Sequence, residues 1–186
     1  VEPYPLYAEK NFRPDFADIP EETAKAAKFM IISYPANPLC SVADDSFYEK
    51  AIAFAKKYNV ILLHDNAYSD IIFGGKEGKS FLSYKGAMEV GIEFYSLSKS
   101  DNRTGMRISV ALGNKEVIQM FRKVRSQIDY GILLPIQKAA VAALTGPQDN
   151  VKEQCRIYEE RNYALCRGMS SIGWKIPDGQ GTMFVW

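Results

Sequence analysis

Cysteine and histidine are scarce in this sequence, which contains three cysteines and one histidine among 186 residues. The cysteines Cys40, Cys155 and Cys166 form no CxxC pair, and an odd, widely spaced set does not suit a disulfide framework. The sequence therefore predicts no metal site. It also favours a reducing compartment, the cytoplasm, where free thiols persist.

No charge of one sign dominates, and long apolar runs are missing. Lysine and arginine total 23 against 22 aspartate and glutamate, so the formal net charge is +1. Because nucleic-acid surfaces need clustered basic residues, we expect no nucleic-acid partner. No apolar run is long enough to cross a bilayer and no signal peptide pattern opens the chain, so we expect no membrane partner.

What the sequence does contain is 47% apolar residues, enough for a sizeable core. Short apolar runs alternate with amphipathic stretches, which predicts an α/β fold of three layers, α/β/α, with a mainly parallel sheet. Strands are expected at 29–33, 60–63, 92–97 and 106–112, and helices at 21–27, 45–58, 115–129, 135–145 and about 147–171. Further strands expected at 172–176 and 183–186 would begin a second, small C-terminal domain. The predicted domains are 1–146 and 147–186.

Polar residues gather where the predicted strands end. In open α/β sheets, ligands bind beyond the carboxyl ends of the strands, so residues there are expected to converge on one site. The candidates are Asn37, Asp65, Tyr68, Ser96, Ser98, Lys99 and Arg107.

Lys99 has two interpretations. A lysine at a strand end is usually solvated, but one whose pKa is lowered becomes a nucleophilic amine that condenses with aldehydes. The hydroxyls of Ser96 and Ser98 and the planar fork of Arg107 are donors suited to a phosphate. Together these groups would suit a phosphorylated aldehyde.

The residues after the first two strands also have alternatives. Asp65 could be an ordinary turn carboxylate, or it could keep a pyridine nitrogen protonated and so make the ring an electron sink. Tyr68 could pack, or it could donate its hydroxyl to the ring's phenolate oxygen. Asn37 could shape the turn before Pro38, or it could reach that oxygen or a substrate carboxylate. His64 precedes Asp65 on a strand, so it should face the opposite side and be packed or hydrogen-bonded rather than catalytic.

These motifs, in this order, resemble the class I/II aminotransferases of pyridoxal-phosphate (PLP) fold type I, the aspartate aminotransferase superfamily. The motifs are Asn37-Pro38, Asp65-Asn-Ala-Tyr68, Ser96-Leu-Ser-Lys99 and Gly105-Met-Arg107. The stretch from Gly91 to Lys99 resembles the LL-diaminopimelate, aspartate and alanine aminotransferase branches. The opening Tyr4-Pro-Leu-Tyr7 and the closing residues 181–186 resemble segments inside the family's fold, so the chain resembles the central part of a longer protein.

The resemblance implies a PLP-dependent aminotransferase that moves an amino group between an amino acid and a 2-oxo acid and works as a homodimer. Lys99 would form the Schiff base with the cofactor and shuttle the proton, and Asp65 would pair with the pyridine nitrogen. The other implied contacts are Tyr68 and Asn37 to the ring's 3′ oxygen, and Ser96, Ser98 and Arg107 to the phosphate.

The chain also departs from the family pattern. Asn37-Pro-Leu-Cys40 replaces the usual Asn-Pro-Thr-Gly, and Asp101 and Arg103 put charges near the phosphate site, where they could pair with each other. The family's N-terminal segment and C-terminal domain, which complete the site, are not in these 186 residues, so we expect this chain alone to be poorly active.

Three other functions fit parts of this pattern. A C–S β-lyase of the same fold would use the same Lys99 chemistry. The PLP-sensing domain of a transcription regulator would require a basic winged helix as well. A non-PLP α/β binding domain would form no Schiff base at Lys99.

Overall fold

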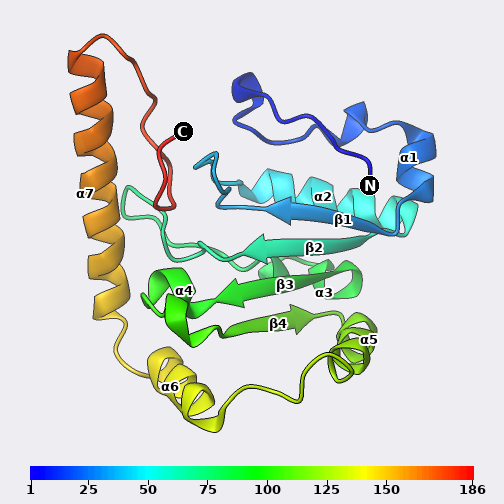
Figure 1. Cartoon of the computed structure of the whole chain (residues 1–186). Helices are drawn as coiled ribbons and strands as arrows, with labels where there is room; N and C mark the ends of the chain where they lie inside the picture. The colour runs from blue at the N-terminus through cyan, green and yellow to red at the C-terminus, as the bar shows by residue number, and fades with distance from the viewer.

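A four-stranded sheet lies at the centre of the structure, a computed structural model that describes residues 1–186 (Figure 1). Its strands are β1 (Phe29–Ser33), β2 (Ile61–Asn66), β3 (Gly91–Ser96) and β4 (Ser109–Gly113), in that spatial order. The first three strands run parallel, and β4 runs antiparallel to β3. The expected mainly parallel sheet is therefore confirmed.

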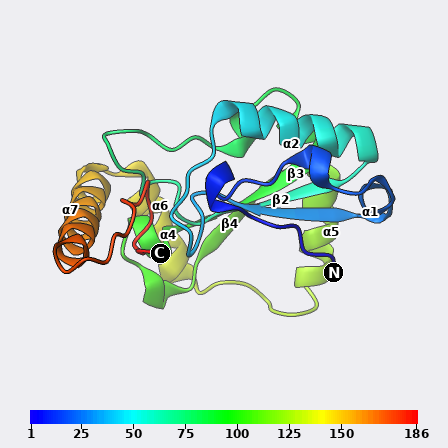
Figure 2. The same cartoon turned by 90° about the horizontal axis from the view of Figure 1, so that it is seen from above.

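Helices lie on both faces of the sheet (Figure 2). Helix α2 (Asp45–Tyr58) covers one face, and α5 (Lys115–Arg125) packs on the other, where Phe121 contacts Phe94 of β3 with ring centres 6.0 Å apart. The three-layer α/β/α arrangement is therefore confirmed. The second helical layer leaves part of the sheet open, because Phe29 and Ile31 of β1 are 60% and 64% exposed.

The remaining helices lie around these layers. They are α1 (Glu21–Ala26), α3 (Ala87–Val90), α4 (Leu97–Ser100), α6 (Leu134–Thr145) and α7 (Asp149–Ser171). The predicted helices at 21–27, 135–145 and 147–171 are confirmed to within two residues, whereas the one predicted at 115–129 ends at Arg125. None of the helices combines the length and the hydropathy needed to cross a membrane.

Helix α2 forms because its sequence supplies both caps and an apolar stripe. The Asp44 carboxylate accepts the N–H of Phe47 at 2.9 Å, and Asn59 ends the helix in the left-handed region with φ 55°. The stripe packs on Ile32 of β1 and Leu62 of β2. Its buried members are Phe47, Tyr48, Ala51, Ile52, Phe54 and Ala55. This core holds β1 and β2 in position, and with them the segments that follow their carboxyl ends.

Replacing Asp44 with alanine is expected to lower the free energy of unfolding by about 1 kcal/mol, because the N–H of Phe47 loses its acceptor. Asp44→Asn keeps a capping oxygen and should cost only a few tenths of a kcal/mol. Urea denaturation of the two variants measures both values. Equal losses would contradict the capping account and would assign the effect to the ion pair between Asp44 and Arg13.

The strands predicted at 172–176 and 183–186 are wrong. The chain is irregular after α7 ends at Ser171, and its one strand-like contact is an isolated bridge between Gly181 and Ile72. An apolar run forms a strand only where a neighbouring strand completes its hydrogen bonds, and the chain offers residues 172–186 none. Their backbone bonds to loops instead, as in Thr182 N–H to the Ile71 carbonyl at 2.8 Å.

The strand predicted at 106–112 starts later, at Ser109. Residues Thr104–Met106 form a 3-10 turn, and Arg107 has a left-handed backbone with φ 50°, which extended structure does not accommodate. Arg107 therefore lies before β4 rather than on it.

Candidate functional site

The carboxyl ends of β1, β2 and β3 meet at one edge of the sheet because these strands are parallel neighbours. In their register, Asp65 of β2 lies between Ser33 of β1 and Phe94 of β3. Since side chains alternate along a strand, Asp65 and Ser96 point to the face opposite α2. Asp65 is exposed on this face, and its Oδ1 accepts the Ala67 N–H at 3.3 Å.

Three segments from different strand ends come together around Tyr68. The Asn37 side chain, from the loop after β1, donates its Nδ2–H to the Tyr68 hydroxyl at 3.2 Å. The Lys99 Nζ, from α4 after β3, lies 5.5 Å from the centre of the Tyr68 ring. Burial raises the pKa of Tyr68, and the charge of Asp65 raises it further against the opposing bond from Asn37. The Tyr68 hydroxyl therefore keeps its proton at neutral pH and can donate it.

Ser96 shapes the turn in which β3 passes directly into α4 (Figure 1). Its Oγ accepts the Ser98 N–H at 3.2 Å, which leaves the Ser96 hydroxyl proton free for a ligand. Ser98 itself is buried, whereas Lys99 is half-buried. The structure therefore presents Ser96 and Lys99 more openly than Ser98.

Arg107 is exposed after the 3-10 turn, and its Nη1 donates to the Thr104 carbonyl at 3.0 Å. Asp101 and Arg103, which the sequence suggested could pair, form no ion pair. Asp101 accepts from the Ser100 hydroxyl at 3.1 Å, and the Arg103 Nε is buried without a partner. The loop between Lys99 and Arg107 thus holds a second arginine, whose Nη1 points to the Met106 sulfur at 4.0 Å.

Three charged candidates form no ion pair within the chain: Asp65, Lys99 and Arg107. One anion and two cations stand at a single edge of the sheet without neutralising one another. Such an arrangement can hold a ligand that carries an anionic group and a protonated ring nitrogen.

The model of the aminotransferase class I and II family matches residues 1–186 of the chain. The chain belongs to this family. Family membership confirms the resemblance that we inferred from the motifs around Asn37, Asp65 and Lys99.

Several relatives within the family are close in sequence. LL-diaminopimelate aminotransferases from Syntrophobacter fumaroxidans and Halothermothrix orenii are 44% and 43% identical over 182 residues, which cover 98% of this chain and 47% of each relative. The apo-BacF structure from Bacillus subtilis superposes with a TM-score of 0.93 at 40% identity, over 98% of this chain and 47% of that one. The chain thus spans about half the length of the curated relatives it matches.

Residues 180–184 form a wall of the candidate site that no sequence pattern predicted. The Phe184 ring packs edge-on against Tyr68, with centres 5.7 Å apart. Cys40 ties this segment to the loop that carries Asn37, since its Sγ bonds to the Phe184 carbonyl at 3.2 Å and its carbonyl accepts the Gln180 N–H at 3.1 Å. Figures 1 and 2 both place this segment, drawn in red, beside the carboxyl ends of the strands. No local pattern could reveal contacts between residues so far apart in sequence.

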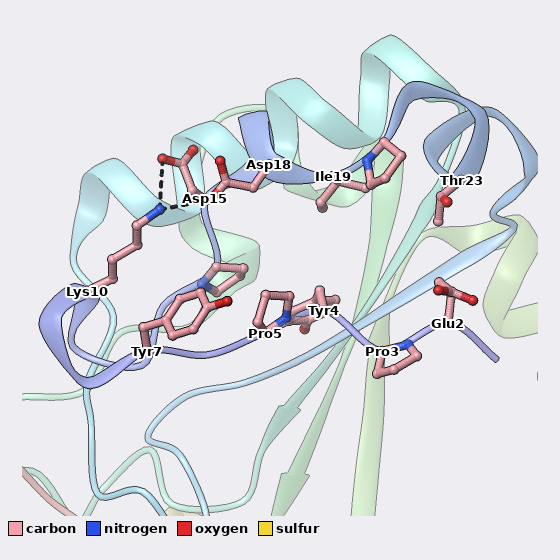
Figure 3. A pocket seen from close by; sticks show the side chains of 12 residues that line it. Glu2, Pro3, Tyr4, Pro5, Tyr7, Lys10, Asp15, Asp18, Ile19 and Thr23 are labelled. Carbon is pink, nitrogen blue, oxygen red and sulfur yellow. Dashed lines mark hydrogen bonds and ion pairs between the residues drawn. The ribbon is translucent and has the colours of Figure 1, made fainter.

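A hollow lies on the N-terminal segment, away from this site (Figure 3). Its volume is about 210 Å³, and Tyr4, Tyr7 and several prolines line it. Lys10 crosses its rim to Asp18 at 2.8 Å. None of the predicted cofactor-binding residues lines this hollow.

Tyr68→Phe keeps the ring but removes the hydroxyl proton that would reach the cofactor's 3′ oxygen. We expect the dissociation constant for PLP to rise about tenfold, the value of one hydrogen bond. Equilibrium titration followed by PLP absorbance measures this constant. The matched control is Tyr58→Phe, because Tyr58 is half-buried at the end of α2 and lies away from the site. Equal constants for wild type and Tyr68→Phe would contradict a ring contact from this hydroxyl.

Proposed function

We propose that this chain forms the cofactor-binding part of a PLP-dependent aminotransferase that transfers an amino group between an amino acid and a 2-oxo acid. The observation that carries the proposal is the meeting of Asn37 and Lys99, from the ends of two different strands, at Tyr68, whose pKa the charge of Asp65 also affects. Family membership of the whole chain supports it.

The residues present fit PLP. Lys99 supplies the amine for covalent attachment of the aldehyde, and Asp65 supplies the carboxylate for the pyridine nitrogen. Tyr68 and Asn37 supply donors for the 3′ oxygen, while Ser96 and Arg107 supply donors for the phosphate, with Ser98 behind them in the buried turn. When bound, the cofactor supplies an electron sink for the pair of electrons that a substrate Cα–H bond releases.

The chain's own residues then perform positioning and proton transfer. The Asp65 carboxylate favours the protonated ring nitrogen by its charge. The Lys99 amine would accept the proton from the substrate Cα and return it to the cofactor's aldehyde carbon. Phe184, together with Tyr68, helps to exclude water from that amine. Arg107 and Ser96 keep the cofactor's reactive carbon within reach of Lys99 by anchoring its phosphate.

The proposed substrate is an amino acid of the kind that the relatives' names indicate. LL-diaminopimelate is the first donor to test, because relatives named for that activity are 43–44% identical to this chain. The 2-oxo acid that accepts the amino group completes the reaction.

We also propose that the full-length protein is a homodimer of the cytoplasm. Large apolar side chains stay exposed along α5, α6 and their connection, a surface that a partner subunit would cover. Examples are Met120, Ile128, Tyr130, Leu133 and Val141, which are at least 61% exposed. The three cysteines are free, which supports a reducing compartment.

An assay of the full-length protein tests the proposed reaction. Purified protein with PLP is mixed with LL-diaminopimelate or another amino acid, with and without a 2-oxo acid acceptor, and the new amino acid is quantified by chromatography. We expect amino transfer that requires the acceptor. Release of ammonia and a 2-oxo acid without any acceptor would instead indicate lyase chemistry and would overturn the proposal.

A further inference from the structure

His64, the only histidine of the chain, is fully buried at the carboxyl end of β2. Its side chain points to the α2 face, away from the site, as the alternation of strand side chains predicts. The rings of Tyr48 and Phe81 surround it edge-on, with centres 5.4 and 5.7 Å away. A buried imidazole is costly unless its nitrogens are hydrogen-bonded, so its partners determine its protonation.

Both ring nitrogens of His64 face hydrogen-bond acceptors. Nδ1 lies 2.9 Å from the Glu93 carboxylate, and Nε2 lies 3.1 Å from the Tyr34 carbonyl. Glu93 is itself an acceptor, because it takes hydrogen bonds from the Ser80 hydroxyl at 2.8 Å and the Phe81 N–H at 2.7 Å. Burial raises the pKa of Glu93, but the bonds from His64, Ser80 and Phe81 outweigh it and the net pKa is lowered. A carbonyl and a carboxylate cannot donate, so both of these contacts are hydrogen bonds only if each ring nitrogen carries hydrogen.

The partners of His64 lie in the segments that deliver the site residues. Tyr34 is three residues before Asn37, and Glu93 is three residues before Ser96 and six before Lys99. His64 itself adjoins Asp65. One buried ring therefore ties together the loop after β1, the end of β2 and the strand that leads to Lys99.

We propose that His64 is a positioning residue: as a doubly protonated imidazolium it clamps three strand ends and thereby sets the spacing of Asn37, Asp65 and Lys99. This deepens the proposed function, since it rests on these three residues forming the cofactor site. The alternative is a neutral ring that merely fills the core, with Nε2 accepting from the Tyr48 hydroxyl. That contact is longer, 3.4 Å, and would leave the Tyr34 carbonyl facing a lone pair.

Nitrogen-15 NMR of the protein labelled at histidine tests the clamp without any cofactor. The His64 signals are assigned by their loss in His64→Asn. We expect both ring nitrogens at neutral pH to show shifts of protonated nitrogens and to couple to attached hydrogens. An unprotonated Nε2 would overturn the proposal whatever the protein's reaction is.

A double-mutant cycle tests whether the clamp acts on the site. In His64→Asn, the amide nitrogen can replace Nδ1 toward Glu93, but the link to Tyr34 is lost. Asn37→Ala is expected to raise the PLP dissociation constant about tenfold in the wild type but only about twofold in His64→Asn, because the loop is already released. In His64→Gln, the amide nitrogen can replace Nε2 toward Tyr34. In that background Asn37→Ala should again raise the PLP dissociation constant by close to tenfold.

The control for general destabilisation is Ile52→Ala, which weakens the same core from α2 without touching His64. In that background Asn37→Ala should again cost about tenfold in PLP affinity. Equal costs of Asn37→Ala in the wild type and in His64→Asn would overturn the positioning role. Absence of PLP binding in every variant, the wild type included, would overturn the proposed function, while the NMR result would still decide the state of His64.

Discussion

Replacing Lys99 with alanine is expected to lower kcat for amino transfer by at least about a thousandfold in the full-length protein. The Nζ lies 5.5 Å from the Tyr68 ring and forms no ion pair, so its amine is free for the cofactor and then for the substrate proton. No other lysine occupies the end of a parallel strand beside Asp65. The removal therefore takes away both the covalent anchor and the proton carrier. Steady-state kinetics with saturating PLP measures the loss.

Lys85→Ala is the matched control, because Lys85 is an exposed lysine away from the strand ends. Its kcat should equal the wild-type value. Circular dichroism would establish that Lys99→Ala remains folded. A folded Lys99→Ala protein with kcat within about tenfold of the wild type would contradict the role of Lys99 in proton transfer.

Asp65→Asn is expected to lower kcat on the order of a hundredfold while it changes the PLP dissociation constant much less. The amide has nearly the same shape but lacks the charge that keeps the pyridine nitrogen protonated, and that proton makes the ring an effective electron sink. Asp65 is well placed for this role because it is exposed on the site face and makes only a local bond to the Ala67 N–H.

The control for Asp65→Asn is Asp18→Asn, which removes a surface carboxylate paired with Lys10 in the N-terminal segment. That variant should keep full activity, since an exposed pair contributes little and lies away from the site. If Asp65→Asn weakened PLP binding with kcat unchanged, Asp65 would only help to bind the cofactor, and its electronic role would be refuted.

Local patterns predicted the parts of the fold whose causes are local. Helix α2 followed from a capping aspartate, an apolar stripe and a closing asparagine, all readable within residues 44–59. The position of Asp65 and Lys99 at one edge of the sheet followed from the parallel order of β2 and β3, since parallel strands end at the same edge. The buried face of His64 followed from its position next to Asp65.

Features that depend on distant partners were not predictable in the same way. The runs at 172–176 and 183–186 have strand-like composition, but they find loops rather than a strand to pair with. The contact of Phe184 with Tyr68 and the bonds of Cys40 to the same segment join residues more than 100 positions apart. The clamp of His64 between Tyr34 and Glu93 also depends on the register of three strands. The contacts of Phe184, Cys40 and His64 lie around the site. The sequence therefore identified the chemical groups of the site better than the long-range contacts that position them.

Reductive trapping tests the central claim most directly. The protein is incubated with PLP and reduced with borohydride, and the pyridoxyl-labelled peptide is mapped by mass spectrometry in the wild type and in Lys99→Ala. We predict that the label falls predominantly on Lys99 and disappears in the variant. Labelling of the full-length protein that is spread over surface lysines such as Lys85 and unchanged in Lys99→Ala would contradict the account.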